Sequence, residues 1–264
     1  MKDLKIAIIQ AELHWENADG NLAMFEEKIW TIHEEVDLIL LPEMFSTGFS
    51  MNPAELAEVS GLKTQKWMLQ MAVQRDALVG GSYIVRQGEH FYNRFVFAFP
   101  DGTIQFYDKR HLFSLAKEED YFTAGQERLV VTYKGWRICP MVCYDLRFPV
   151  WARNHVTLDG DYGYDLLLYV ANWPKVRIKA WDTLLPARAI ENLAYVAGVN
   201  RTGLDGNEHL YDGHSAVYDA LGEQMTRPLI GEEGILIQKV DKLALDMVRQ
   251  KFAFLRDADA FDIR

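Results

Sequence analysis

The sequence predicts an α/β protein in which helices cover mixed β-sheets. Short apolar runs typical of strands alternate with helical patterns along most of the chain. Several neighbouring strand-like runs are joined by glycine-containing turns, which favour antiparallel hairpins, whereas strands separated by helices favour parallel pairing. No Pro-, Ser- or Gly-rich linker divides the chain, so we expect a single domain over residues 1–264.

The expected elements begin with a strand at Leu4–Gln10 and a helix at Asn21–Glu35, whose apolar residues recur at three- and four-residue spacing. The rest of the first half is expected to contain a strand at Val36–Leu41, a helix at Leu62–Arg75 and strands at Leu78–Arg86, His90–Phe99 and Thr103–Lys109. The second half is expected to contain strands at Arg128–Tyr133, Trp136–Val142, Asp165–Ala171, Tyr195–Asn200, Leu210–Asp219 and Gly234–Val240, with helices at Arg177–Leu193 and from Asp241.

Composition excludes several classes of protein. Hydrophobic residues make up 49% and charged residues 25% of the 264 residues, which is typical of a globular chain and unlike a disordered one. The net charge is −10 and no Lys/Arg cluster is present, so we expect no nucleic-acid partner. The N-terminus does not resemble a signal peptide and no run approaches the roughly 18 apolar residues of a membrane helix. We therefore expect a cytoplasmic protein without a membrane partner.

Two cysteines, Cys139 and Cys143, lie four residues apart on one expected strand. Positions i and i+4 of a strand are about 13 Å apart, too far for a disulfide. With no second Cys/His pair at ligand spacing, a zinc site is a weak alternative. The chain also lacks the glycine-rich dinucleotide and phosphate motifs, the H-E-x-x-H motif and the G-x-S-x-G motif.

Three apolar strands are each followed closely by a reactive side chain. Glu43 follows Leu38–Pro42, Lys109 follows Ile104–Asp108, and Cys143 follows Arg137–Val142. Ligands of α/β folds tend to bind outside the carboxyl ends of strands, so we expect these three side chains to converge on one cleft.

A carboxylate, an ammonium and a thiol together suit acyl transfer. A free thiol is only slightly ionised at neutral pH, so a nucleophilic Cys143 requires a base such as Glu43. Lys109 and the backbone N–H of Tyr144 are candidate donors to the oxyanion that forms after attack. Singly, each residue has a structural interpretation: Glu43 as a loop residue or helix cap, Lys109 as a surface strand end, and Cys143 as a small core residue, which is our interpretation of Cys139.

The local sequences around these residues resemble the nitrilase superfamily of carbon–nitrogen hydrolases. The resemblance runs from the first strand to about Val240, and its motifs occur in the family's order: Leu-Leu-Pro-Glu-Met-Phe (40–45), Tyr-Asp-Lys-Arg-His-Leu-Phe (107–113), Val-Cys-Tyr-Asp-Leu-Arg-Phe-Pro (142–149), Ala-Asn-Trp-Pro (171–174) and Arg-Ala-Ile-Glu-Asn (188–192). It implies a four-layer αββα sandwich of two mixed β-sheets flanked by helices.

The resemblance also implies a catalytic triad and a thioester mechanism that needs no metal or organic cofactor. Glu43 would be the general base, Lys109 the oxyanion-stabilising acid and Cys143 the nucleophile. A second active-site glutamate is expected in the loop after the lysine, where Glu118 fits best by its spacing before Ala124-Gly125. Glu119 is the alternative for this role. The non-catalytic interpretation is that both glutamates belong to an acidic loop in solvent.

Within the superfamily, the segments Cys-Tyr-Asp-Leu-Arg-Phe-Pro-Val-Trp and Ala-Asn-Trp-Pro are most similar to bacterial ω-amidases, which hydrolyse the terminal amide of 2-oxoglutaramate and related acids. Arg147 is then a candidate for binding the substrate carboxylate, because a guanidinium pairs with a carboxylate in a bidentate fork. It is equally well placed in sequence to pair with Asp145 or Glu191. Trp173 is expected either to line the pocket or to pack in the core.

The resemblance implies a homodimer or higher homo-oligomer. Apolar residues suited either to such an interface or to the core are Trp181, Leu184, Leu185, Ile190, Phe252, Phe254 and Phe261. Three other functions remain open at this point: hydrolysis of a nitrile, N-carbamoyl compound or simple aliphatic amide; a catalytically silent scaffold of the same fold; and a redox or zinc protein that uses both cysteines.

Overall fold

The larger of two mixed sheets pairs the first strand of the chain with its last strand. The computed structural model describes residues 3–157, 160–259 and 261. The strand order of this sheet is β14-β1-β2-β4-β5-β6, with β3 paired to β4. The strands are β1 (Leu4–Gln10), β2 (Leu38–Leu40), β3 (Glu58–Val59), β4 (Leu78–Gln87), β5 (His90–Ala98), β6 (Ile104–Asp108) and β14 (Gly234–Val240). β1, β2 and β4 run parallel, whereas β5, β6 and β14 join by antiparallel pairing.

The second sheet has the order β13-β10-β9-β8-β7. Its strands are β7 (Val131–Tyr133), β8 (Trp136–Val142), β9 (Leu166–Ala171), β10 (Tyr195–Asn200) and β13 (Ala216–Tyr218). The three central strands run parallel and the two edge strands are antiparallel to them. A separate small hairpin pairs β11 (Thr202–Leu204) with β12 (Leu210–Asp212).

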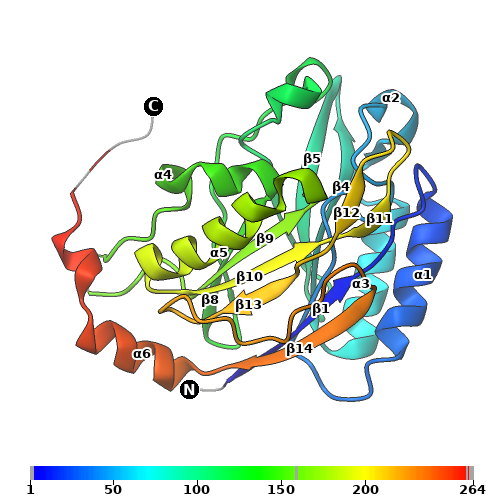
Figure 1. Cartoon of the computed structure of the whole chain (residues 1–264). Helices are drawn as coiled ribbons and strands as arrows, with labels where there is room; N and C mark the ends of the chain where they lie inside the picture. The colour runs from blue at the N-terminus through cyan, green and yellow to red at the C-terminus, as the bar shows by residue number, and fades with distance from the viewer. Residues whose placement is uncertain (1–2, 158–159, 260, 262–264) are drawn as a thin grey trace.

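Helices cover the outer faces of the two sheets, which confirms the expected mixed α/β sandwich (Figure 1). The longer helices are α1 (Ala18–Trp30), α3 (Lys63–Arg75), α5 (Ile178–Asn192) and α6 (Lys242–Lys251); the short ones are α2 (Pro53–Leu56) and α4 (Pro149–Ala152). Phe25 of α1 and Met68 of α3 pack against Ile39 and Val79 of the first sheet. The largest core cluster joins both sheets and α5, so side chains such as Leu40 and Leu167 share one buried interior.

Several expected boundaries differ from the observed ones for local reasons. The first helix spans Ala18–Trp30 and not 21–35, because the Asn17 side chain accepts a hydrogen bond from the Gly20 N–H and caps the helix earlier. The expected strand at 210–219 is two strands, β12 and β13, since Gly213 and His214 between them have positive φ angles of 81° and 65°. The hairpin strand β11 was not expected.

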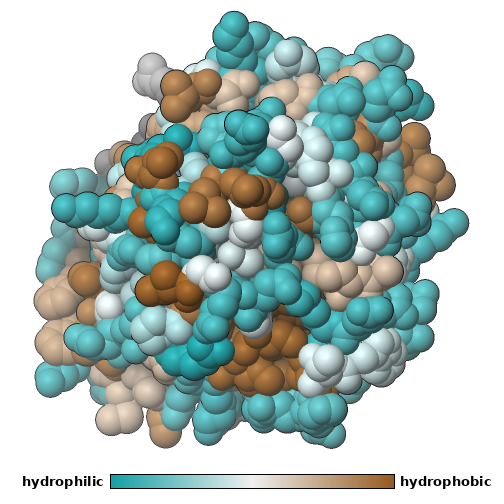
Figure 2. Space-filling view, turned by 45° about the vertical axis from the view of Figure 1, so that its right-hand side comes forward, coloured by the Kyte–Doolittle hydropathy of each residue, from teal (hydrophilic) through white to brown (hydrophobic). Residues whose placement is uncertain are grey.

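The surface carries mostly hydrophilic residues with scattered apolar ones in the view of Figure 2. No helix within the described ranges combines the length and the apolar character needed to cross a membrane.

Candidate active site

The carboxyl ends of four strands meet at one edge of the two sheets. β6 points the same way as β4 and β2, because it is separated from β4 by two antiparallel pairings. Glu43 lies just beyond β2, Lys109 follows β6 and Cys143 follows β8. β9, which runs parallel to β8, ends one residue before Asn172. The topology thus brings together the three reactive side chains that sequence reasoning singled out.

Lys109 lies at the centre of this cluster and is completely enclosed. Its Nζ is 3.0 Å from Glu43 Oε1 and 2.8 Å from Glu118 Oε2, and none of the three side chains is exposed to solvent. A second contact of 3.0 Å joins Nζ to Glu118 Oε1. Buried charges are tolerated only when they are paired in this way.

Backbone and amide groups fix the orientation of Glu43. Asn93 Nδ2 donates to Glu43 Oε1 at 2.8 Å, and the Asn172 N–H donates to Oε2 at 2.8 Å. Asn172 Nδ2 also donates to the backbone carbonyl of Glu43 at 2.7 Å. Asn93 Nδ2 lies 3.4 Å from Glu118 Oε1 as well, so one amide group spans the two carboxylates. The base candidate is therefore held by Asn93 of β5 and by Asn172, which directly follows β9 of the other sheet.

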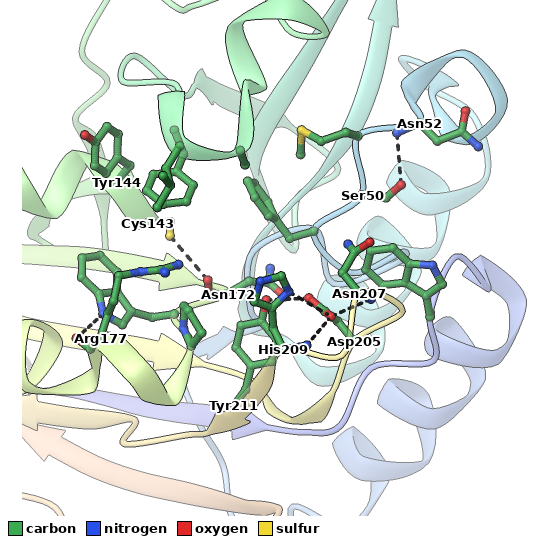
Figure 3. A pocket seen from close by; sticks show the side chains of 18 of the residues that line it. Ser50, Asn52, Cys143, Tyr144, Asn172, Arg177, Asp205, Asn207, His209 and Tyr211 are labelled. Atoms are coloured by element: carbon green, nitrogen blue, oxygen red, sulfur yellow. Dashed lines mark hydrogen bonds and ion pairs between the residues drawn. The ribbon is translucent and has the colours of Figure 1, made fainter.

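Cys143 occupies a strained elbow between β8 and the 3₁₀ turn η3 (Cys143–Arg147). Its φ angle is +44°, in the left-handed region that side-chain-bearing residues rarely adopt. The turn presents the thiol to a pocket that Lys109 and the glutamates do not line (Figure 3). The thiol donates to the Asn172 carbonyl oxygen at 3.9 Å. Of this cluster, the nucleophile candidate alone faces the pocket, while the charged groups lie beneath it.

The enclosed charges shift the proton affinities of the cluster. Burial raises the pKa of Cys143 well above its ordinary value, Glu43 and Glu118 raise it further, and Lys109 only partly opposes them. Burial acts to lower the pKa of Lys109, but Glu118 and Glu43 outweigh it and raise that pKa. Burial also raises the pKa of Glu118 despite the opposing Lys109 charge. The resting site therefore holds a neutral thiol and a protonated lysine.

The loop after Lys109 distinguishes the two adjacent glutamates. Glu118, in the 3₁₀ turn η2 (Glu118–Asp120), is buried and accepts a 2.6 Å hydrogen bond from the Phe113 N–H, whereas Glu119 is exposed. The loop returns to β6 at Gly125, whose N–H donates to the Lys109 carbonyl at 2.9 Å. A Cβ at Gly125 would lie 2.0 Å from the Asp108 carbonyl oxygen, so only glycine allows this close approach.

A second buried carboxylate, Asp145, links the lysine strand to the cysteine elbow. Its Oδ2 accepts hydrogen bonds from Tyr107 Oη at 2.8 Å and from the Val142 N–H at 2.9 Å. Its Oδ1 accepts the His111 N–H at 3.1 Å and lies 2.7 Å from His111 Nδ1. The two motifs around Lys109 and Cys143 are thereby held in fixed relation.

The pocket above Cys143 has a volume of about 470 Å³. Tyr144, Arg147, Asn172 and Trp173 line it. The Tyr144 N–H belongs to the first turn of η3, where backbone donors have no acceptor within the turn.

Arg147 is exposed and places its guanidinium carbon 4.9 Å from the centre of the Trp173 ring. The two sequence alternatives for Arg147 are not seen in the described residues, because Asp145 binds Tyr107 and His111 while Glu191 pairs with Arg188. Trp173 combines both of its expected roles, since it lines the pocket and is only 3% exposed.

Sequence reasoning missed Asn93, Asn172 and Asp145 as parts of the site. Asn93 carried a detectable signal, because a polar residue inside the aromatic strand His90–Ala98 is unusual unless it has buried partners. Asn172 and Asp145 lie within segments that the sequence analysis singled out. Their hydrogen-bond partners, Glu43 and Tyr107, are far away in the chain, so the sequence did not indicate these contacts. The pocket wall formed by Asp205, His209 and Tyr211 of the β11–β12 hairpin had no sequence signal.

Comparison with known proteins agrees with this geometry. The model of the carbon-nitrogen hydrolase family matches residues 5–250. The chain belongs to the carbon–nitrogen hydrolase family. This carbon–nitrogen hydrolase is 47% identical to the omega-amidase YafV of Yersinia enterocolitica, and the alignment covers 99% of both chains. It is 33% identical to a 2-oxoglutaramate amidase of Bacillus subtilis, with 96% of both chains covered.

A crystal structure supports the same family membership. The carbon–nitrogen hydrolase XC1258 of Xanthomonas campestris, described with an arsenic adduct in its active site, superposes with a TM-score of 0.97 at 42% identity, and the match covers 100% of both chains. This agreement confirms the nitrilase-type fold.

Proposed function

We propose that this carbon–nitrogen hydrolase is an omega-amidase that cleaves the terminal amide of a 2-oxo dicarboxylic acid monoamide such as 2-oxoglutaramate. The observation that carries the proposal is the enclosed Glu43–Lys109–Glu118 cluster directly beneath a thiol that faces a small pocket. Relatives that align over nearly the whole chain and bear the names omega-amidase and 2-oxoglutaramate amidase supply the substrate class.

In the first half-reaction Cys143 attacks the amide carbon. The high pKa of the thiol requires that its proton pass to Glu43 as the carbon–sulfur bond forms. Lys109 and the Tyr144 N–H donate to the oxygen that becomes negative in the tetrahedral intermediate. Glu43 then returns the proton to the leaving nitrogen, ammonia departs, and a thioester remains on Cys143.

In the second half-reaction water replaces ammonia. Glu43, again unprotonated, takes a proton from water as the water oxygen attacks the thioester carbon. The thiolate leaves, regains its proton from Glu43, and the carboxylic acid product is released. Glu118 holds Lys109 in position throughout and orients the amide or the water; this assignment rests on its two contacts with Nζ.

The non-reacting end of the substrate carries a carboxylate. We assign Arg147 to bind it, supported by the position of its guanidinium in the pocket and its lack of a carboxylate partner among the described residues. Trp173 forms an apolar wall behind it.

The decisive experiment measures ammonia release from 2-oxoglutaramate, glutamine, a nitrile and an N-carbamoyl amino acid. We expect the highest kcat/KM with 2-oxoglutaramate; no release from that amide would overturn the substrate assignment. C143A should abolish turnover and eliminate the trapped acyl adduct detectable by mass, whereas C139A, which alters only a buried core thiol, should retain both. Turnover by C143A would contradict the nucleophile assignment.

We also propose a single domain over residues 1–264 that assembles as a homodimer. Of the apolar residues considered for an interface, Trp181 and Leu185 are buried in the core. Ile190, Phe254 and Phe261 are 52%, 61% and 52% exposed, which supports an interface. Light scattering of the wild type and of I190D tests this, since only a dimer whose interface contains Ile190 should dissociate in the variant.

A further inference from the structure

The pocket above Cys143 has an uneven charge distribution. Two guanidinium groups, from Arg147 and Arg177, line it together with Cys143. Figure 3 shows Arg177 on the side that carries Cys143 and Tyr144, whereas Ser50 and Asp205 lie on the other side. The positive charge is local, since the whole chain carries a net charge of −10.

The acidic residues of the pocket are already bound to other groups. Asp205 accepts hydrogen bonds from the Asn207 and His209 N–H groups at 2.8 and 2.9 Å and from Tyr211 Oη at 2.8 Å. Glu16 accepts a 2.5 Å bond from Ser50 Oγ. Within the described ranges of the chain, no carboxylate lies within ion-pair distance of either pocket arginine.

Aromatic rings hold both guanidinium groups in place. The guanidinium carbon of Arg177 lies 5.1 Å from the centre of the Phe113 ring, and its backbone carbonyl accepts a 2.9 Å bond from Trp173 Nε1. Trp173 in turn lies beneath Arg147. A guanidinium over a ring keeps its N–H donors free at its edge, so both groups are prepared to bind an anion with little loss of entropy.

The two arginines also share a shallow hollow on the surface next to the pocket. Lys179 lines that hollow and does not line the pocket. Two guanidinium groups therefore border the approach to Cys143, which favours the entry of an anion, whereas Lys179 lies outside the pocket.

We infer that Arg177 is a specificity-determining residue that, together with Arg147, selects amides bearing a carboxylate on the end that does not react. This inference rests on the proposed amidase function and adds a second cation to the substrate site. The ligand class is a short anionic monoamide, because a carboxylate can bridge two guanidinium groups while its amide carbon reaches Cys143 in the same pocket.

The test compares hydrolysis of 2-oxoglutaramate with that of a neutral aliphatic amide of similar length. R177Q should lower the ratio of kcat/KM for the anionic amide to that for the neutral amide by about 10- to 100-fold, mostly through KM. R177K, which restores the charge without the planar fork, should recover part of the ratio. The matched control K179Q should leave both substrates within about twofold of the wild type.

The outcomes separate this inference from the proposed function. In R177Q, equal losses of kcat/KM on both amides would overturn the inference, because Arg177 would then only hold η4 (Lys175–Arg177) against Phe113. Unchanged kcat/KM values on both amides would overturn it as well, because Arg177 would then have no role in either reaction. Absence of 2-oxoglutaramate hydrolysis by the wild type would instead overturn the proposed function. In that case the R177Q ratio is measured with the N-carbamoyl amino acid as the anionic substrate, and an unchanged ratio there would overturn the inference independently.

Discussion

Tyr107 Oη donates a 2.8 Å hydrogen bond to Asp145 Oδ2 and thereby joins the strand that precedes Lys109 to the elbow that carries Cys143. The same hydroxyl accepts bonds from Trp151 Nε1 at 3.0 Å and from the Arg110 N–H at 3.2 Å. Because the tyrosine is 1% exposed, water cannot replace these bonds when the hydroxyl is removed.

Y107F is therefore expected to lower the free energy of unfolding by about 1 to 3 kcal/mol and to reduce kcat, since the buried partners lose their hydrogen bonds. Urea denaturation and steady-state kinetics measure the two effects. Y169F is the matched control, because the Tyr169 hydroxyl is buried without a hydrogen-bond partner in the described structure. Similar stability losses in the two variants would show that the Asp145 network contributes nothing.

Glu118 and Glu119 offer a direct test of the second glutamate. E118Q removes the carboxylate that contacts Lys109 Nζ at 2.8 Å, and kcat should fall about 100-fold or more. E119Q changes an exposed side chain and should leave kcat near the wild-type value. The rate of ammonia release from 2-oxoglutaramate distinguishes them, and equal rates would remove Glu118 from the catalytic machinery.

The ionisation of Cys143 should follow from the charges beneath it. Burial and the negative Glu43 both raise the pKa of the thiol, so the wild type should show no Cys143 thiolate at neutral pH. In E43Q one negative charge is gone, and the thiolate should form at lower pH than in the wild type.

Ultraviolet absorbance of the thiolate, taken as the difference from C143A at each pH, measures this shift. Cys139 does not contribute to this difference spectrum, because it is present in both the wild type and C143A. Burial also raises the pKa of Cys139 to about 12. Ionisation of Cys143 in the wild type below about pH 8.5 would contradict the prediction.

Asp165 anchors α6 to the second sheet through Lys242 Nζ at 2.7 Å and Arg249 Nη1 at 2.6 Å. All three side chains are almost fully buried, so D165N leaves two cations without their counter-charge and should cost about 3 to 5 kcal/mol of stability at neutral pH. D246N, which removes a partly exposed contact with the same lysine at 3.4 Å, should cost less than about 1 kcal/mol. Urea midpoints compare the two, and a small loss in D165N would contradict the prediction.

The same aspartate should contribute to acid sensitivity. Burial by itself raises the pKa of Asp165, but hydrogen bonds from Lys242 and the Arg137 N–H outweigh it, so the pKa lies below its ordinary value. A depressed folded-state pKa means that this stabilisation is complete above the unfolded-state pKa of about 3.9 and is lost as the pH falls through the folded-state pKa. The stability difference between the wild type and D165N should therefore shrink in acid, and a constant difference from pH 7 to acid would contradict this assignment.

The sequence by itself determined most strands, the mixed α/β class and the three segments that carry Glu43, Lys109 and Cys143. These features are local, because apolar periodicity and turn residues act over a few positions. Helix ends and the division of β12 from β13 were less predictable, since they depend on a cap at Asn17 and on positive φ angles at Gly213 and His214.

Only the tertiary structure decided which groups surround the reactive side chains. The hydrogen bond from the Asn172 N–H to Glu43 spans 129 positions, and the contact between Asn93 and Glu43 spans 50. Such pairs form because parallel strands of two sheets end at one edge, and no local pattern specifies which loop residues then face one another. The burial that raises the pKa of Cys143, and the freedom of Arg177 from a carboxylate partner within the described chain, likewise follow from this packing.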